Sequence, residues 1–204
     1  MRIVTCRCEK SFDAELPEEL DLDKDPSVLD EILEGSFLSV TCPHCGETIK
    51  PEMPVLLSSR RLGLALRVVP EAERSSWLSG RLKPPSGSEL LIGFSELRER
   101  AMIIRDGLEA RCVEILKYFI LAKAFEEADP ASELLVSYRG KREDGRLSFA
   151  IGGLRNDEEA LLALPFDRYE KAKKDLPRLE STEPYSSFLL GAYRSIRALE
   201  AEAS

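Results

Sequence analysis

Two short segments of the chain repeat one pattern around paired cysteines, and this repeat restricts the fold more than any other feature. Residues 4–12 read Val-Thr-Cys-Arg-Cys-Glu-Lys-Ser-Phe, and residues 40–49 read Val-Thr-Cys-Pro-His-Cys-Gly-Glu-Thr-Ile. In both copies a tight turn carries two cysteines, and a hydroxyl residue followed by an apolar residue begins the return. The pattern predicts two β-hairpins, each with a cysteine pair at its turn.

The candidate metal ligands are the four cysteines of these turns: Cys6, Cys8, Cys42 and Cys45. Zn²⁺ prefers four thiolates in a tetrahedron, and two facing cysteine turns make a zinc ribbon. Pro43 stiffens the second turn, and Gly46 permits the positive φ that lets the chain turn under a metal. With four thiolates the ion has no open position, so the predicted zinc site is structural.

Two features of the pattern depart from a common zinc ribbon. Cys6-Arg7-Cys8 has a single residue between its cysteines, and 33 residues separate Cys8 from Cys42, whereas common ribbons have roughly 15–20. The alternative hypothesis is therefore four reduced thiols, or a disulfide, in a small β module.

The other candidate catalytic or ligand residues are few. His44 is the single histidine; it is an alternative ligand to Cys8, but its place inside the turn favours a solvent-facing side chain. One histidine argues against Ser-His-Asp and Cys-His hydrolases, and no glycine-rich loop indicates a nucleotide fold. Cys112 shares a helical face with Leu108, Ile115 and Phe119, which indicates core packing. An enzyme is therefore the least favoured interpretation.

Charge and hydropathy limit the partners. The 204 residues carry a net charge of −8, which disfavours general binding to DNA or anionic lipid. No apolar stretch is long enough to cross a bilayer, and the N-terminus lacks a secretory apolar segment, so we expect a cytoplasmic protein. In that reducing compartment, cysteines indicate metal binding or free thiols before disulfides.

The spacing of apolar residues, together with helix-capping and helix-ending residues, predicts a mixture of helices and strands. Residues 9–34 form an acidic linker with a local charge of −9, and its second half predicts a helix that Asp25 caps and Gly35 ends. Strands are expected at 55–58, 62–69 and 90–94, and a loop at 77–88. A helical region follows over 95–128, which Gly107 divides and in which Asp106 caps the second part.

The last quarter of the chain predicts a hairpin and further helices. Residues 134–138 and 147–151 alternate around an Asp-Gly loop, which indicates a hairpin. Helices are expected over 166–176, where Pro177 ends the first, and over 185–199. The predicted fold class is α+β: a zinc-ribbon-like N-terminal β module, joined to a strand-and-helix domain with a C-terminal hairpin and helices. The predicted domains are residues 1–128, with the ribbon-like part at about 1–57, and residues 129–204.

The paired turns, with Cys42-Pro43-His44-Cys45, resemble the bacterial and archaeal CpXC domain, which is named for its Cys-Pro-x-Cys motifs. The similarity continues through residues 54–57, 62–70 and 95–119 and covers roughly residues 1–128. The chain departs from the family pattern at Cys6-Arg7-Cys8, which lacks the proline and one residue. The resemblance implies a zinc-ribbon-like element and implies no activity.

Two function hypotheses follow. The first is a zinc-binding interaction or scaffold module that contacts a protein partner. The alternative is a single-stranded nucleic-acid binder that uses the ribbon and residues 60–83, where the local charge is +4 and Trp77 offers a stacking ring. Because aromatic residues are nearly absent from this basic region, the protein partner is favoured.

Overall fold

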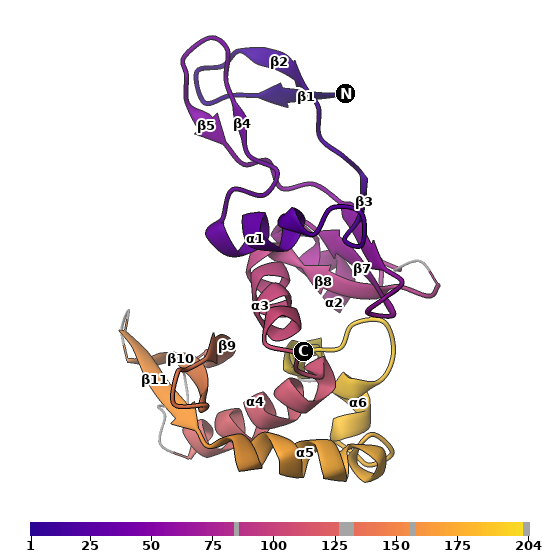
Figure 1. Cartoon of the computed structure of the whole chain (residues 1–204), viewed down its shortest axis with the longest axis vertical. Coiled ribbons are helices and arrows are strands. Elements are labelled where there is room, and N and C mark those ends of the chain that lie inside the picture. The colour runs from indigo at the N-terminus through magenta and orange to yellow at the C-terminus, as the bar shows by residue number, and fades with distance from the viewer. Residues whose placement is uncertain (84–85, 127–132, 156–157, 202–204) are drawn as a thin grey trace. The chain divides into compact units, whose positions relative to one another are not determined.

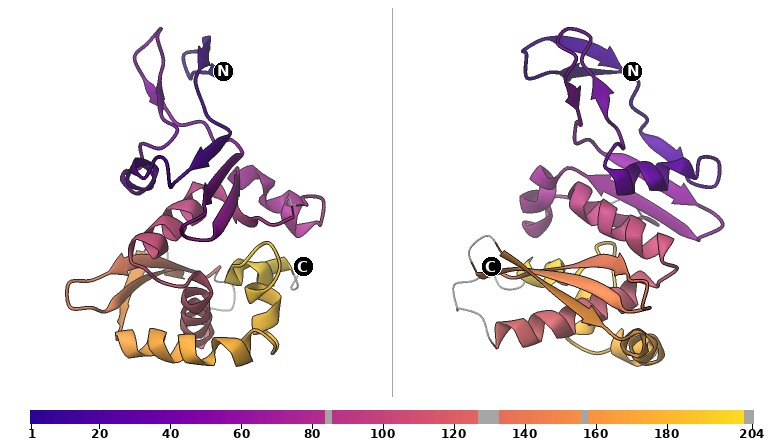
Figure 2. Two further views of the ribbon diagram at one scale, coloured as in Figure 1. Left: turned by 45° about the vertical axis from the view of Figure 1, so that its right-hand side comes forward. Right: turned by 60° about the vertical axis from the view of Figure 1, so that its left-hand side comes forward.

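The computed structural model describes residues 1–83, 86–126, 133–155 and 158–201. The chain divides into two compact units, Met1–Arg98 and Glu99–Ser204, and both combine helices with antiparallel or mixed sheets (Figures 1 and 2). The predicted α+β class is therefore confirmed. The predicted domain boundary at 128/129 lies outside the described residues and stays a prediction. Among the described residues, no helix has both the length and the apolar character that a membrane crossing requires.

The two cysteine segments form two hairpins with the same register. The first pairs β1 (Arg2–Thr5) with β2 (Ser11–Ala14), and the second pairs β4 (Val40–Thr41) with β5 (Thr48–Ile49). In each hairpin the Val of the Val-Thr-Cys motif faces an apolar residue, and the Thr faces a hydroxyl residue. The hairpins predicted from the sequence repeat are therefore confirmed.

A four-stranded mixed sheet forms the centre of the first unit, in the order β3-β6-β7-β8. Its strands are β3 (Glu19–Asp21), β6 (Val55–Ser59), β7 (Leu64–Val69) and β8 (Glu89–Ile92). The central pair is antiparallel, whereas β3 joins β6 and β8 joins β7 in parallel. Residues 9–34 are thus not only a linker, because β3 extends the sheet from within the acidic segment.

Helix α1 (Ser27–Glu34) packs its apolar face into the first unit. Val28 and Ile32 are buried, and the helix ends at Gly35 in a left-handed conformation (φ 84°), as predicted. The predicted cap at Asp25 is wrong: its carboxylate accepts a hydrogen bond from the Ser27 hydroxyl at 2.6 Å, and no side chain caps the helix N-terminus.

The segment between β7 and β8 begins with helical turns, which extend into the loop predicted over 77–88 only as far as Leu78; the described residues from 79 to 88 are not helical. A 3-10 helix at Glu71–Glu73 leads into α2 (Arg74–Leu78), so Trp77 belongs to a helix. Arg74 is nearly buried and binds the carboxylates of Glu71 and Glu96. These ion pairs stabilise the helical turns against the start of α3 (Gly93–Arg105).

The second unit contains a three-stranded antiparallel sheet, in the order β11-β10-β9, and four further helical segments. The strands are β9 (Leu135–Lys141), β10 (Leu147–Arg155) and β11 (Glu158–Leu164). The helical segments are α4 (Ala110–Phe125), α5 (Phe166–Leu179), α6 (Tyr185–Leu189) and a 3-10 helix at Ile196–Ala201. The predicted hairpin is β9 and β10, and β11 extends it.

The structure corrects two expectations about α4. Asp106 does not cap this helix, because its carboxylate accepts hydrogen bonds from the Tyr138 hydroxyl at 2.7 Å and from the Lys141 amide at 2.9 Å. The Tyr169 hydroxyl instead accepts the Glu109 N–H at the start of α4, at 2.8 Å. Cys112 is fully buried as expected, but Phe119 is 52% exposed and lies off the core face.

The structure also corrects two expectations near the C-terminus. Pro177 lies inside α5, which continues to Leu179 because Leu176 and Leu179 are both buried. The single helix predicted over 185–199 is two pieces, α6 and the 3-10 helix, and the chain leaves the helical conformation at Leu190. Amphipathic spacing alone did not reveal this break.

One ion cluster lies buried in the second unit. Lys117 contacts Glu114 at 2.8 Å and Glu99 at 3.1 Å, and the three side chains are 4%, 6% and 13% exposed. Each carboxylate also accepts a backbone N–H, Glu99 from Tyr138 at 2.6 Å and Glu114 from Ile196 at 2.8 Å. The cluster therefore ties two helices to a strand and to the C-terminal segment.

Candidate metal centre

The turns of the two hairpins bring the four predicted cysteines together. All four sulfur atoms lie within 4.8 Å of one another. The shortest contacts cross between the hairpins: Cys6 Sγ to Cys45 Sγ is 3.6 Å, and Cys8 Sγ to Cys42 Sγ is 3.8 Å. A regular tetrahedron with metal–sulfur bonds of about 2.3 Å has sulfur atoms about 3.8 Å apart. The cluster therefore has the size of a four-thiolate metal site.

The sulfur separations are far too long for a disulfide, whose S–S bond is about 2.05 Å. All five cysteines of the chain are free. The disulfide alternative is thus not what the structure shows.

The second hairpin turn is built from the backbone of Cys42–Glu47. The Cys42 amide donates to the Glu47 carbonyl at 2.8 Å, and the Gly46 amide donates to the Cys42 carbonyl at 2.9 Å. Burial acts to raise the pKa of Cys42, but the backbone N–H groups of His44 and Cys45 donate to its sulfur and lower the pKa to about 7. The turn is therefore prepared to hold a thiolate.

The first hairpin turn follows the same plan with one residue fewer. The Cys6 amide donates to the Lys10 carbonyl and the Glu9 amide donates to the Cys6 carbonyl, both at 2.9 Å. Glu9 occupies the place of Gly46, directly after the second cysteine, and both have a left-handed φ, 65° and 75°. The shortened turn therefore keeps its sulfurs in place by forcing a non-glycine residue into a conformation that glycine adopts more easily.

Charge repulsion among the sulfurs calls for a cation. The Cys8 N–H donates to the Cys6 sulfur and lowers its pKa, but burial and the neighbouring thiols outweigh this and raise the pKa of Cys6 to about 12. The first cysteine of each turn is buried, whereas Cys8 is partly exposed and Cys45 is exposed. Four thiols in one place cannot all ionise without a bound positive charge, so the arrangement fits a divalent metal ion.

Neither His44 nor Cys112 belongs to the group of convergent ligand atoms. His44 is exposed on the outside of its turn, and the four convergent ligand atoms are all sulfur. Cys112 is fully buried in α4, where burial raises its pKa to about 11. Glu47 is the carboxylate next to the cluster, with Oε2 3.9 Å from the Cys6 sulfur and Oε1 3.6 Å from Arg7.

The basic region at residues 60–83 is partly engaged in the fold. The backbone N–H groups of Arg60 and Arg61 donate to the Asp23 carboxylate, at 2.7 and 3.1 Å. The Arg74 side chain is 11% exposed and ion-paired, and Trp77 is partly buried. Arg74 and Trp77, two residues of the predicted nucleic-acid surface, are therefore held by contacts within the protein.

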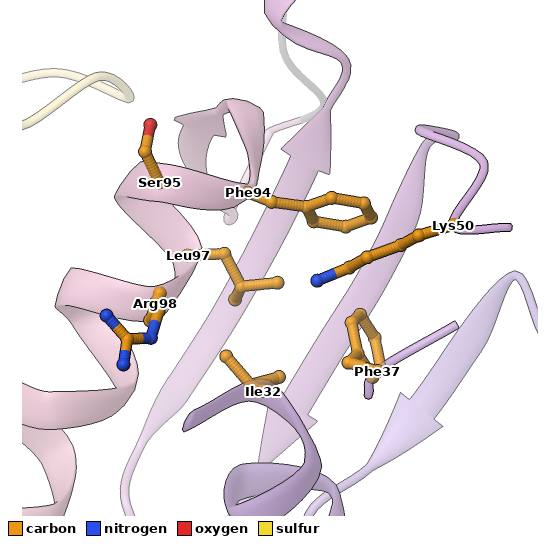
Figure 3. Close-up of a pocket in the computed structure, with 7 residues that line it drawn as sticks. All are labelled: Ile32, Phe37, Lys50, Phe94, Ser95, Leu97 and Arg98. Atoms are coloured by element: carbon orange, nitrogen blue, oxygen red, sulfur yellow. The ribbon is translucent and has the colours of Figure 1, made fainter. Parts of the chain in front are cut away.

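A small hollow in the first unit shows residues that the sequence pattern did not single out. It has a volume of about 230 Å³, and Figure 3 shows the Lys50 side chain between the rings of Phe37 and Phe94. Lys50 Nζ lies 4.5 Å from the centre of the Phe94 ring and 3.4 Å from the Gly35 carbonyl, and Arg98 binds the Leu33 carbonyl at 3.1 Å. Burial, and then the nearby Arg98, lowers the pKa of Lys50.

These contacts give the hollow a structural role. Both cations bind carbonyls at the C-terminal end of α1, where positive charge is favourable. The volume is also below that of usual small-molecule sites, about 300–1,000 Å³.

The paired cysteine turns match a known family. The pattern of the CpXC protein family covers residues 4–117, more than half of the chain. The chain belongs to the CpXC family. An uncharacterised protein of Treponema pallidum (strain Nichols) is 27% identical over an alignment of 217 positions that covers 97% of each chain. No solved structure matches this CpXC protein.

Proposed function

We propose that Cys6, Cys8, Cys42 and Cys45 hold one structural Zn²⁺ in a zinc-ribbon-like element, and that this CpXC protein is an interaction or scaffold module for a protein partner. One observation supports the metal site above all others: sulfurs from two hairpins approach to 3.6 and 3.8 Å, the separation that tetrahedral zinc requires. The matching register of the hairpins supports the ribbon-like description.

The chain's own groups would prepare the ligands for the ion. Backbone N–H groups donate to the sulfurs of Cys6, Cys42 and Cys45, which favours thiolates. A bound zinc would supply two positive charges and a cross-link between the hairpins. With all four positions filled by sulfur, no position remains for water or substrate, so the role is structural.

The proposal places the protein in a reducing compartment such as the cytoplasm, because free thiolates persist there. Tetrahedral sulfur sites also accept iron, so the metal must be identified directly. The net charge of −8 supports a protein partner over a nucleic acid, since an acidic chain is repelled by phosphates.

Metal analysis of protein purified without chelator tests the site. We expect about one zinc per chain in the wild type and in Cys112→Ser, and loss of the metal in Cys8→Ser and Cys45→Ser. Cys112→Ser is the matched control, because this cysteine is buried in the second unit, outside the cluster. If the protein contains iron in place of zinc, the proposed identity of the metal is wrong and the metal site itself stands. Less than about one tenth of any metal per chain would reject the site.

A further inference from the structure

The second unit contains a large open groove. Its walls come from the helices α4, α5 and α6 and from the strands β10 and β11, and its volume is about 950 Å³. Figure 1 shows α5 directly following β11 and running beside α4, and these two helices are in contact. The volume reaches the upper end of the range for small-molecule sites, so an extended occupant must be considered.

The bottom of the groove is apolar. Helix α4 lines it along one face, at Leu116, Phe119, Ile120 and Ala124. Ile151 and Leu162 line it from the sheet, and Ala172 and Leu179 from α5. Phe119 stands half-exposed at this surface, with its ring 6.1 Å from that of Tyr185. The groove therefore offers apolar and aromatic contact area to a partner.

Cations follow the edge of the groove. Arg168, Lys171 and Arg178 come from α5 and Lys123 from α4, and Asp175 is the single acidic residue among the lining residues. All four cationic residues are exposed, and within the described ranges none forms an ion pair. The groove is thus positively charged in a chain whose net charge is −8.

The spacing of these cations indicates the shape of the occupant. Arg168 and Arg178 are ten residues apart on one helix, which corresponds to a distance of about 15 Å along its axis. A ligand with one anionic headgroup and an apolar tail can reach only one end of this row. An occupant with several negative charges along its length can pair with all of it.

We propose that the groove binds an acidic amphipathic helix of a partner protein, with apolar side chains on the bottom of the groove and carboxylates along the edge. This mode of recognition requires apolar residues at helical spacing on the partner. The inference deepens the proposed function in taking the partner to be a protein, and it does not depend on the metal. Charge complementarity would mainly favour association and fix the orientation of the partner.

A display library of random 16-residue peptides, selected on the full-length protein, provides the probe. We expect enriched peptides to combine Asp and Glu with apolar residues at i, i+3, i+4 and i+7. Binding of an enriched peptide, followed by fluorescence anisotropy, should weaken when NaCl rises from roughly 0.05 M to 0.5 M. Enrichment of neutral or basic peptides, or no enrichment, would overturn the proposal.

Charge-reversal variants locate the binding. Arg168→Glu/Lys171→Glu should weaken the peptide at least about tenfold, and Arg178→Glu should also weaken it because the occupant spans the row. Lys173→Glu/Lys174→Glu is the matched control, because these exposed lysines lie on the same helix and do not line the groove. Equal affinity in all variants would keep a protein-binding role and reject this groove as its location.

Two further measurements distinguish the proposed helix from a lipid occupant, and the groove proposal from the metal proposal. Oleate is the lipid probe. The proposal would be overturned in favour of a single-headed ligand if oleate binds with one-to-one stoichiometry and displaces the peptide, and if Arg178→Glu changes the affinity for neither ligand. Zinc content is measured on the same preparations. Stoichiometric zinc without peptide binding rejects only the groove, whereas peptide binding without metal rejects only the metal site.

Discussion

Replacement of Lys117 by Met should destabilise the second unit strongly. The ammonium group contacts the carboxylates of Glu114 and Glu99, and the side chains of Lys117 and Glu114 are 4% and 6% exposed. Methionine has a similar length but leaves two carboxylates buried without a cation. Removing one partner of a buried ion pair costs about 3–5 kcal/mol, so we expect the unfolding free energy to fall by about that amount at neutral pH.

The loss should depend on pH in a defined direction. Burial raises the pKa of Glu114 in the folded chain, against the lowering effect of Lys117. A carboxyl that holds its proton more tightly when folded lowers stability as the pH rises above the carboxyl's unfolded pKa, about 4.3. Without Lys117 this pKa rises further. The difference between wild type and variant should therefore be smaller at about pH 4.5 than at about pH 7.5.

Urea unfolding followed by near-ultraviolet circular dichroism measures this effect. All five tyrosines lie in the Glu99–Ser204 unit and the single tryptophan, Trp77, lies in the other, so tyrosine bands report on the second unit. The double variant Lys117→Met/Glu114→Gln should recover part of the loss, since one of the stranded charges is gone. A loss below about 1 kcal/mol at neutral pH, or one that does not change with pH, would refute the reasoning.

Two further predictions concern the cysteines and their turns. Gly46→Ala should lower the unfolding free energy of metal-loaded protein by about 1 kcal/mol, because the φ of 75° is unfavourable for alanine, whereas the new methyl group meets no atom within 4 Å. Glu9→Gly should instead stabilise the protein or leave its stability unchanged. Thermal melts of both variants test the two predictions. Cys112 should resist thiol reagents in the folded protein, because burial raises its pKa to about 11; modification of five thiols in native, metal-stripped protein at the rate of a free thiol would contradict this.

The hairpins and most of the helices were predictable because their signals are local. The repeated Val-Thr-Cys pattern carries both strands and turn of each hairpin, so nothing distant is needed to recognise it. That the four sulfurs converge follows from the same repeat. The shortened turn at Cys6-Arg7-Cys8 departed from the expected ligand spacing. The left-handed conformation of Glu9 lets this turn bring its sulfurs to the cluster, and a glutamate does not suggest that conformation.

The features that were missed depend on distant residues. Strand β3 is three residues long in an acidic segment, and it forms because it pairs in parallel with β6. The start of α4 looks capped by Asp106, but Tyr169 supplies the hydrogen bond from 60 residues away. The groove of the second unit has no sequence pattern of its own, because its lining residues come from three helices, two strands and the segments that connect them.

The position of the sulfur cluster in the chain has a consequence for how the first unit responds to loss of its ion. Between Cys8 and Cys42 the backbone passes through β3 and α1, so a shared ion closes a ring of roughly 35 residues, whose entropy by the relation used for cross-linked chains corresponds to about 4 kcal/mol. Chelation or oxidation at the exposed thiol of Cys45 would release this restraint from an edge strand and a core helix together. Chemistry at an exposed cysteine would thereby increase local unfolding of β3 and α1 in the interior of the first unit.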